Sequence, residues 1–243
     1  MGEAKRRKHT GAPSPRSNGN KKPMIIAVSV AVVIAVIVGL YMTTRPPAPT
    51  SSALPVAAPG APEFPAALDQ YGVSVGPDDA PVVVREFADY QCPACATFAP
   101  ASKRLKDEYV DTGKVRFVYF DLPLRQHPNA VPAAQAARCA GDQDQYWPMH
   151  EKLYSAQSEW SGTSDPTATF TRYANGLGLD ERRFNRCLAT ELHKEAVEDS
   201  LQVATQMRVM STPTVMVDNI QLTRPGWGQL SAVVERELNK TEN

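Results

Sequence analysis

The sequence predicts an α/β domain with a long helical insertion, preceded by a single membrane-spanning helix. Short runs of β-branched residues after residue 82 alternate with amphipathic helical patterns. About 90 residues lie between the second predicted strand and Thr212, far more than a simple crossover needs, and their patterns are helical. The uncharged stretch from Met24 to Met42 has 19 residues, enough to cross a hydrocarbon core of about 30 Å.

Basic residues surround this uncharged stretch. Residues 1–45 carry eight basic side chains and one acidic one, so the remaining chain has a net charge of −7 and no signature of nucleic-acid binding. Residues 1–23 are polar and basic, which predicts a solvated tail, and the positive-inside rule places this tail in the cytoplasm. A cleaved signal peptide is the alternative, but its apolar region normally spans only about 7–15 residues. We therefore expect residues 24–42 to anchor the chain in a lipid bilayer, with everything after Arg45 outside the cytoplasm.

A spacer is predicted over residues 43–68. Its main part, residues 46–65, contains seven prolines and five alanines, a composition typical of an extended, semi-rigid linker. A proline-rich ligand for a recognition domain is the rival interpretation, but the usual partners of such ligands are cytosolic. The folded domain is expected over residues 69–243, and no repeat period is visible in it.

The chain has four cysteines, and all of them lie in the predicted exported domain, where oxidation is permitted. Two residues separate Cys92 from Cys95, so these two form a unit. A zinc site of four cysteines usually has two close-spaced pairs, whereas 47 residues separate Cys139 from Cys187. We therefore expect no metal and no other cofactor. Because both lie in apolar helical context, we expect Cys139 and Cys187 to form a structural disulfide, with two buried thiols as the alternative.

The surroundings of Cys92 predict a reactive thiol. Residues 82–87 read as a buried strand, and the apolar residues from Ala94 to Tyr109 recur at helical spacing up to a stop at Gly113. Cys92 thus lies where a strand turns into a helix, and the helix dipole and free N–H groups favour its thiolate. Cys95 is one turn later, close enough to attack a disulfide formed at Cys92. A short structural disulfide is the alternative for this pair.

The other predicted elements follow in order along the chain. A second strand covers residues 115–120, and two strands joined at Asp218-Asn219 precede a final helix from Trp227 to Leu238. The insertion, at about residues 127–208, is expected to contain three helical segments, which are Ala133 to Leu153, a segment opened by Asp180-Glu181, and a third marked by Val197, Leu201, Ala204 and Arg208. His127 and His150 fall in this region, and we interpret both as structural.

The segments EFADYQCPAC (86–95) and Ser211-Thr212-Pro213-Thr214 resemble the thioredoxin fold, specifically the DsbA-like thiol–disulfide oxidoreductases, over about residues 70–240. The resemblance implies that Cys92 is the exposed nucleophile and Cys95 the buried resolving thiol. It also implies a cis peptide bond between Thr212 and Pro213 beside the cysteines, and an insertion that roofs the active site.

Glu86 is implied to be the buried acid that helps move the proton of Cys95; a surface position for Glu86 and a trans bond at Pro213 are the alternatives. The sequence departs from the oxidising members in having Pro93-Ala94, without histidine, between the cysteines. We therefore expect the pKa of Cys92 toward the upper part of the range of activated thiols, about 3.5–7.5.

The resemblance implies an enzyme that introduces disulfides into exported polypeptides and is reoxidised by a membrane partner of the DsbB or VKOR type. A disulfide isomerase or reductase is the first alternative. Family isomerases are dimers with a separate dimerisation domain, for which the spacer leaves no room, so we expect a monomer. A non-catalytic chaperone or adaptor is the second alternative, and loss of one active cysteine would be its mark.

Overall fold

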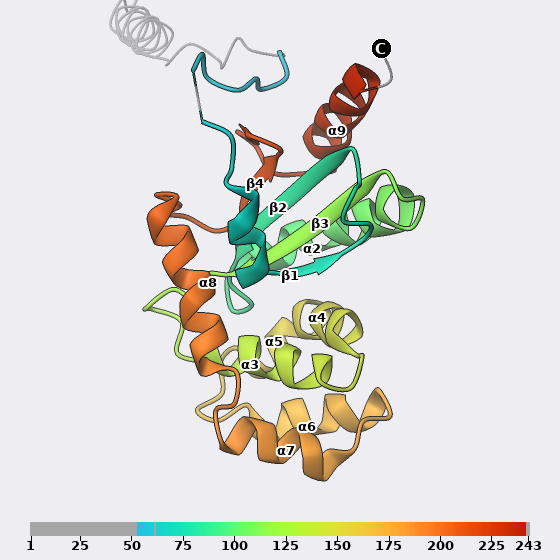
Figure 1. Cartoon of the computed structure of the whole chain (residues 1–243). Helices are drawn as coiled ribbons and strands as arrows, with labels where there is room; N and C mark the ends of the chain where they lie inside the picture. Colours follow the sequence, from blue (N-terminus) through green and yellow to red (C-terminus); the bar gives the residue numbers. More distant parts are fainter. Residues whose placement is uncertain (1–52, 61, 242–243) are drawn as a thin grey trace, which may run out of the picture. The chain divides into compact units, whose positions relative to one another are not determined.

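The computed structural model describes residues 53–60 and 62–241, and its centre is a five-stranded sheet (Figure 1). The strand order is β1-β3-β2-β4-β5, with β2 and β3 parallel and the other pairs antiparallel. The strands are β1 (Val73–Val75), β2 (Val82–Ala88), β3 (Val115–Asp121), β4 (Thr214–Val217) and β5 (Ile220–Gln221). The predicted strands are confirmed, and only the short edge strand β1 was not predicted.

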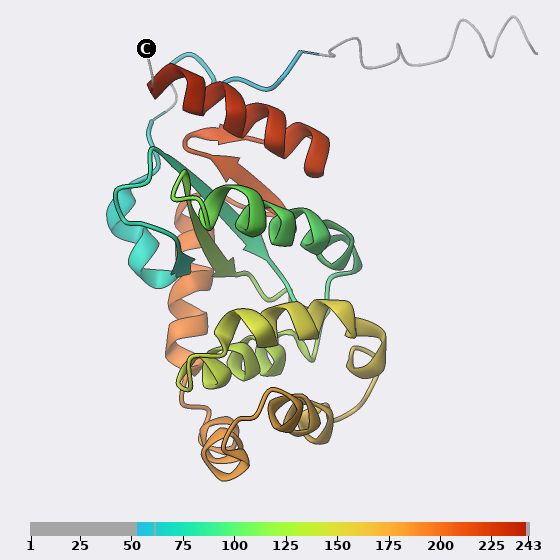
Figure 2. The same cartoon turned by 90° about the vertical axis from the view of Figure 1, so that its right-hand side faces the viewer.

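Both faces of the two central strands are buried, because helices cover each side of the sheet (Figure 2). Alternate residues therefore belong to two different apolar clusters. On one face Val84 and Phe117 pack in a cluster with Phe98 of helix α2 (Pro93–Leu105) and Leu230 of helix α9 (Trp227–Thr241). On the other face Phe87, Val118 and Phe120 pack with Val203 and Ala204 of helix α8 (Lys194–Gln206).

Helix α2 begins directly after Cys92 and continues into a π-helical turn, η2 (Lys106–Val110). Gly113, at φ +77°, ends this continuous segment in the left-handed conformation that glycine tolerates without steric cost. The predicted helix is thus confirmed, with a wider final turn that its apolar spacing did not indicate.

The insertion between β3 and β4 is entirely helical in its regular structure; its first five helices form a layer at one end of the sheet, and α8 packs against one face of the sheet (Figures 1 and 2). It contains α3 (Ala130–Gly141), α4 (Tyr146–Ser155), α5 (Gln157–Trp160), α6 (Thr167–Gly176), α7 (Glu181–Ala189) and α8. The single helical segment predicted over 133–153 is wrong, because the chain turns between α3 and α4 with Asp144 at φ 61°. Arg208, predicted in the last helix, lies beyond its end at φ 56°.

The folded domain begins earlier than residue 69. Phe64 is buried against Phe87 and Phe120, with ring centroids 6.3 and 6.0 Å apart, and a 3-10 helix, η1 (Ala66–Tyr71), follows it. Asp69 of η1 forms a buried ion pair with Arg85 of β2 at 2.6 Å. The last residues of the predicted spacer are therefore part of the core.

The predicted tail, the predicted membrane span (residues 24–42) and the start of the spacer lie outside the described residues. Within residues 53–60 and 62–241, no helix combines the length and the apolar character that crossing a membrane requires.

Candidate active site

The turn between β2 and α2 places Cys92 at the N-terminus of α2. Asp89, which is buried, fixes this turn because its Oδ1 accepts a hydrogen bond from the Gln91 N–H (2.7 Å) and its Oδ2 accepts one from the Leu124 N–H (2.8 Å). Cys92 then takes an extended conformation as the N-cap residue, and Pro93 occupies the first helical position, where its missing N–H is no loss. Cys92 is 7% exposed and Cys95 is fully buried, so only Cys92 is open to a partner.

The chain returns to Cys92 from 120 residues downstream. The peptide bond between Thr212 and Pro213 is cis, and the Cys92 sulfur lies 3.8 Å from the carbonyl oxygen of Thr212, to which the protonated thiol donates. Pro213 leads directly into β4, which pairs with β2, so the sheet itself brings these two segments together. The structure therefore assembles Cys92, Cys95, Thr212 and Pro213 where β2 ends and β4 begins.

The two thiols have opposite acid–base properties. The pKa of Cys92 is lowered to about 5, first by the hydrogen bond from the Cys95 thiol and then by the side chain of Thr212 and the backbone N–H groups of Cys95 and Ala94. The pKa of Cys95 is raised far above its ordinary value by the same hydrogen bond and by burial. At neutral pH Cys92 is a thiolate and Cys95 keeps its proton. The absence of histidine at Pro93-Ala94 led us to expect a pKa in the upper part of the range of activated thiols, and the pKa of Cys92 is lower than that. Hydrogen-bond donors other than histidine stabilise the thiolate.

Glu86 lies in the interior rather than on the surface. Its side chain is on the face of β2 that α2 covers, it is 1% exposed, and its Oε2 accepts a hydrogen bond from the Ser102 hydroxyl at 2.5 Å. Burial raises the pKa of Glu86 to about 7, and the hydrogen bond from Ser102 opposes part of this shift. The negative charge of Glu86 also helps to raise the pKa of Cys95. A buried carboxyl group that titrates near neutral pH, and that is close enough to Cys95 to shift its pKa, can hold or release a proton there.

His127 and His150 both occupy structural positions. The Nδ1 of His127 is 2.8 Å from Asp89 Oδ2, so His127 supports the turn before Cys92. His150 is buried among aromatic rings, and its Nδ1 lies 2.8 Å from the Tyr90 hydroxyl. Burial lowers the pKa of His150 to about 3, which keeps the imidazole neutral. The interpretation of His150 as a residue of the helix core therefore agrees with its surroundings.

Sequence reasoning missed the residues through which the insertion holds the active-site turn. Gln157 of α5 donates hydrogen bonds to the carbonyl oxygens of Tyr90 (2.7 Å) and Cys92 (3.0 Å). The backbone N–H of Asn129 donates to the Gln91 side chain at 2.6 Å. These contacts join residues more than 30 positions apart, and a single glutamine or asparagine carries no spacing pattern that reveals them.

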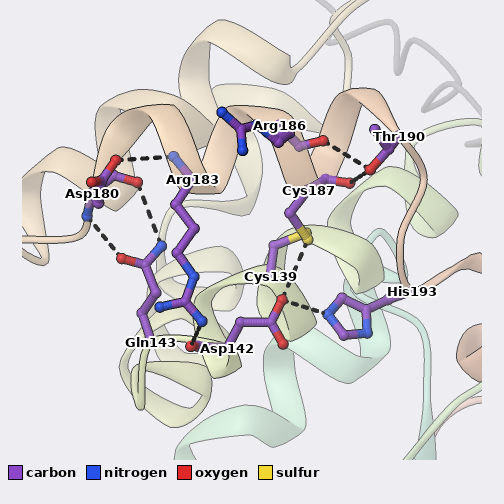
Figure 3. The surroundings of a disulfide bond; sticks show 9 residues. All are labelled: Cys139, Asp142, Gln143, Asp180, Arg183, Arg186, Cys187, Thr190 and His193. Atoms are coloured by element: carbon purple, nitrogen blue, oxygen red, sulfur yellow. Dashed lines mark hydrogen bonds and ion pairs between the residues drawn. A yellow bond between two sulfur atoms is a disulfide. The ribbon is translucent and has the colours of Figure 1, made fainter.

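Cys139 of α3 and Cys187 of α7 form a disulfide, with their Cα atoms 5.8 Å apart. Figure 3 shows that this bond joins two helices of the insertion, and that Asp142 and His193 lie beside it. Cys92 and Cys95 are both free thiols in the structure.

Comparison with known proteins gives a consistent family relationship. A family model described as thioredoxin matches residues 69–236. The probable disulfide bond formation protein D of Bacillus anthracis is 32% identical over 173 residues, which cover 69% of this chain and 78% of that protein. The Na⁺/H⁺ antiporter NhaA 3 of Salinispora tropica is 38% identical over 144 residues, but the chain spans only 21% of the length of that antiporter.

Solved structures show the same fold. Oxidised BdbD from Bacillus subtilis aligns with a TM-score of 0.63 and 23% identity, covering 78% of this chain and all of BdbD. Wolbachia pipientis alpha-DsbA1 aligns with a TM-score of 0.62 and 20% identity, covering 70% of this chain and 92% of alpha-DsbA1. The helical insertion is therefore shared by proteins of low sequence identity.

Proposed function

Because this chain belongs to the thioredoxin family, and within it to the DsbA-like disulfide oxidoreductases, we propose that it introduces disulfides into exported proteins through Cys92 and Cys95. One observation carries the proposal: within one helical turn, the pKa of the outer thiol is lowered to about 5 while that of the inner thiol is raised. A structural disulfide does not need this difference. A disulfide donor does, because it must accept attack at one sulfur and release the same sulfur readily.

The reaction starts with Cys92 and Cys95 joined as a disulfide. A substrate thiolate attacks the sulfur of Cys92, the Cys92–Cys95 bond breaks, and Cys95 leaves and takes up a proton. Glu86, with its pKa near 7, is the nearby group that supplies this proton. A second substrate thiolate then attacks the substrate sulfur of the mixed disulfide, and Cys92 leaves as a stable thiolate. Two electrons pass from the substrate dithiol to the cysteine pair, and a substrate disulfide forms.

Thr212 and Pro213 supply the place where the substrate chain lies. The carbonyl oxygen of Thr212 faces the Cys92 sulfur, and a fixed backbone edge at this point offers hydrogen bonds to an extended chain. Because Cys92 is only 7% exposed, a substrate thiol can reach its sulfur only from a flexible segment of the substrate chain. We assign the substrates as exported polypeptides that carry free thiols before they are fully folded.

The remaining features of the proposal come from the sequence. We propose that residues 24–42 anchor the chain in a lipid bilayer with the catalytic domain outside the cytoplasm, and that a membrane oxidase of the DsbB or VKOR type restores the Cys92–Cys95 disulfide. We propose that the protein acts as a monomer, as an oxidase rather than an isomerase or reductase. The low pKa of Cys92 supports the oxidase, because a stable thiolate favours the reduced form of the enzyme.

Trapping of mixed disulfides tests the roles of the two cysteines. Cys95→Ala should accumulate mixed disulfides with substrates on Cys92, because no second thiol resolves them, whereas Cys92→Ala should form none. Cys139→Ala/Cys187→Ala serves as the control and should trap nothing beyond the unmodified protein. Trapped species of equal yield on Cys95 in the Cys92→Ala protein would contradict the assignment.

The reduction potential tests the direction of exchange. A value above about −180 mV supports an oxidase, and a value near about −270 mV, that of thioredoxin, would assign the protein as a reductant. Equilibration with glutathione, followed by separation of oxidised and reduced protein, gives this value directly.

A further inference from the structure

A cluster of side chains that could bind a metal ion lies around the disulfide of the insertion, separate from the active site. Cys139 of α3, Cys187 of α7 and His193, the residue before α8, place one ligand atom each within 4.8 Å of the others. Asp142 adds a carboxylate, since its Oδ2 lies 2.9 Å from His193 Nε2 and 3.6 Å from Cys187 Sγ. Figure 3 shows the Asp142 carboxylate between the disulfide and the His193 ring.

The Asp142 carboxylate is held by His193, at 2.9 Å, and not by the disulfide. A sulfur in a disulfide carries no hydrogen, so Cys187 donates nothing to the carboxylate oxygen 3.6 Å away. If the disulfide is reduced, two thiols, an imidazole and a carboxylate share this position. Thiolate, imidazole and carboxylate ligands are the set that Zn²⁺ prefers at a four-coordinate site.

We propose that Cys139, Cys187, His193 and Asp142 form a zinc site when their disulfide is reduced. An external dithiol supplies two electrons, becomes a disulfide itself, and breaks the Cys139–Cys187 bond to give two thiols. Zn²⁺ then displaces the two thiol protons and is held by both sulfurs, His193 and Asp142. The same four residues therefore have a cross-linked form and a metal-bound form, and oxidation that rejoins the sulfurs releases the ion.

The geometry requires only a local change. Two sulfurs at about 2.3 Å from a tetrahedral zinc ion are about 3.8 Å apart, so the bonded pair has to separate by roughly 2 Å. The two Cα atoms are 5.8 Å apart, which leaves this change to the side chains. A surface cavity of about 440 Å³, lined by Asp142, Cys187, Arg183 and Arg186 among others, gives reductant and metal a path from solvent.

Metal content under two redox states tests the proposal. The full chain carrying Cys92→Ser and Cys95→Ser removes the active-site thiols as competing ligands. This protein is reduced with dithiothreitol, freed of reductant without air, incubated with zinc chloride and passed through a desalting column. Elemental analysis should find about one zinc ion per reduced chain and none on the oxidised chain. Equal zinc on both forms, or none on the reduced form, would overturn the proposal.

Single variants identify the ligands. His193→Ala and Asp142→Asn should each weaken zinc affinity about 10–100-fold, whereas Asp144→Asn, in the same turn, should leave it unchanged. Co²⁺ is the spectroscopic probe, because a tetrahedral site with thiolates gives visible bands and a near-ultraviolet charge-transfer band that both variants should weaken. Affinity that does not differ among the three variants would reject these ligands.

Thermal unfolding tests the proposal even if the reduced chain is unstable without zinc. Zinc should raise the Tm of the reduced protein, or refold it if it has unfolded, and at the same zinc concentration should have a smaller effect on His193→Ala. A reduced protein whose circular dichroism and Tm do not respond to zinc would also overturn the proposal.

Discussion

The thiolate of Cys92 is stabilised by hydrogen-bond donors rather than by a positively charged neighbour. The largest contribution comes from the Cys95 thiol, and further ones come from Thr212 and two backbone N–H groups. Such donors are local and short-range, so salt should affect this thiolate less than it affects one beside a cation. The sequence between the cysteines therefore underestimates the acidity of the site.

The reactivity of Cys92 should report this acidity directly. The rate of alkylation by iodoacetamide should rise with pH to a plateau with its midpoint at about 5, because only the thiolate reacts. Cys95→Ala should move the midpoint upward, since it removes the first donor. Mass spectrometry of the alkylated peptide measures the rate, and Cys139→Ala/Cys187→Ala is the control. A midpoint at 8 or above would contradict the structure.

The same pKa links stability to pH in the reduced protein. The pKa of Cys92 is lower in the folded state than its ordinary value of 9.0. The contribution of the Cys92 thiolate to stability is therefore complete above pH 9 and is lost as the pH falls through about 5. The oxidised protein lacks this contribution.

Glu86 makes stability depend on pH in the opposite direction. Its pKa is raised from 4.5 to about 7 in the folded state, so its contribution to stability is complete below pH 4.5 and is lost as the pH rises through about 7. Glu86→Gln should remove this dependence and make the protein more stable than the parent at pH 8, by up to about 3 kcal/mol. Urea unfolding at pH 4.5 and pH 8 checks this.

Ser102→Ala is the matched comparison for Glu86→Gln. Ser102→Ala removes the hydrogen bond that lowers the pKa of Glu86. The Ser102→Ala protein should therefore lose stability more steeply than the parent as the pH rises. Equal pH dependence in all three proteins would show that Glu86 is not ionised in this range.

At the scale of elements, strands were easier to predict than the helices of the insertion. The central strands β2 and β3 are buried on both faces and therefore read as nearly continuous apolar runs. Gly141, the last residue of α3, and Pro148, in the first turn of α4, flank the break between these helices, but the residue in the left-handed conformation is Asp144. The apolar spacing continues across the break, and the prediction followed this spacing rather than the glycine and the proline.

The residues of the active site also differ in how well the sequence predicts them. Cys92, Cys95 and Pro213 belong to short motifs that the sequence displays, and Glu86 has a fixed spacing from Cys92. Gln157 and Asn129 reach the active-site turn only because the insertion folds over it. Their function depends on tertiary contacts, which no local pattern encodes.

The disulfide between α3 and α7 should be a major source of stability in the insertion. Cys139→Ala/Cys187→Ala should lower the free energy of unfolding by about 2–5 kcal/mol, since it frees a loop with a sequence separation of 48 residues. Chemical unfolding of the oxidised proteins measures this effect. Hydrogen exchange should locate the loss of protection in α7, and an unchanged midpoint would show that packing alone holds the two helices.

At the scale of the whole molecule, the segment before the sheet is part of the fold. Phe64 lies over Phe87 and Phe120, and the buried Asp69–Arg85 pair follows it. The proline-rich composition predicts an extended linker here, but composition does not show that one aromatic residue in it fits the core. The catalytic domain thus begins within the segment expected to be a spacer.

Phe64→Ala tests where the domain begins. Loss of this buried ring should cost about 3 kcal/mol of unfolding free energy in the full chain. Val56→Ala is the control, because Val56 is 72% exposed and its truncation should change stability by less than about 0.5 kcal/mol. Equal stability of the two variants would place residue 64 outside the folded domain.

The insertion also sets the order in which the active site is completed during synthesis. Cys92 and Thr212 are 120 residues apart, so a ribosome adding about 5–20 residues per second makes Cys92 roughly 6–24 s before Thr212. During this interval the nascent chain carries both active-site cysteines, and later Cys139 and Cys187, without the segment that completes the pocket around Cys92. The cysteine pair is therefore made well before the backbone segment that faces it, and the active site is complete only after the whole insertion has been synthesised.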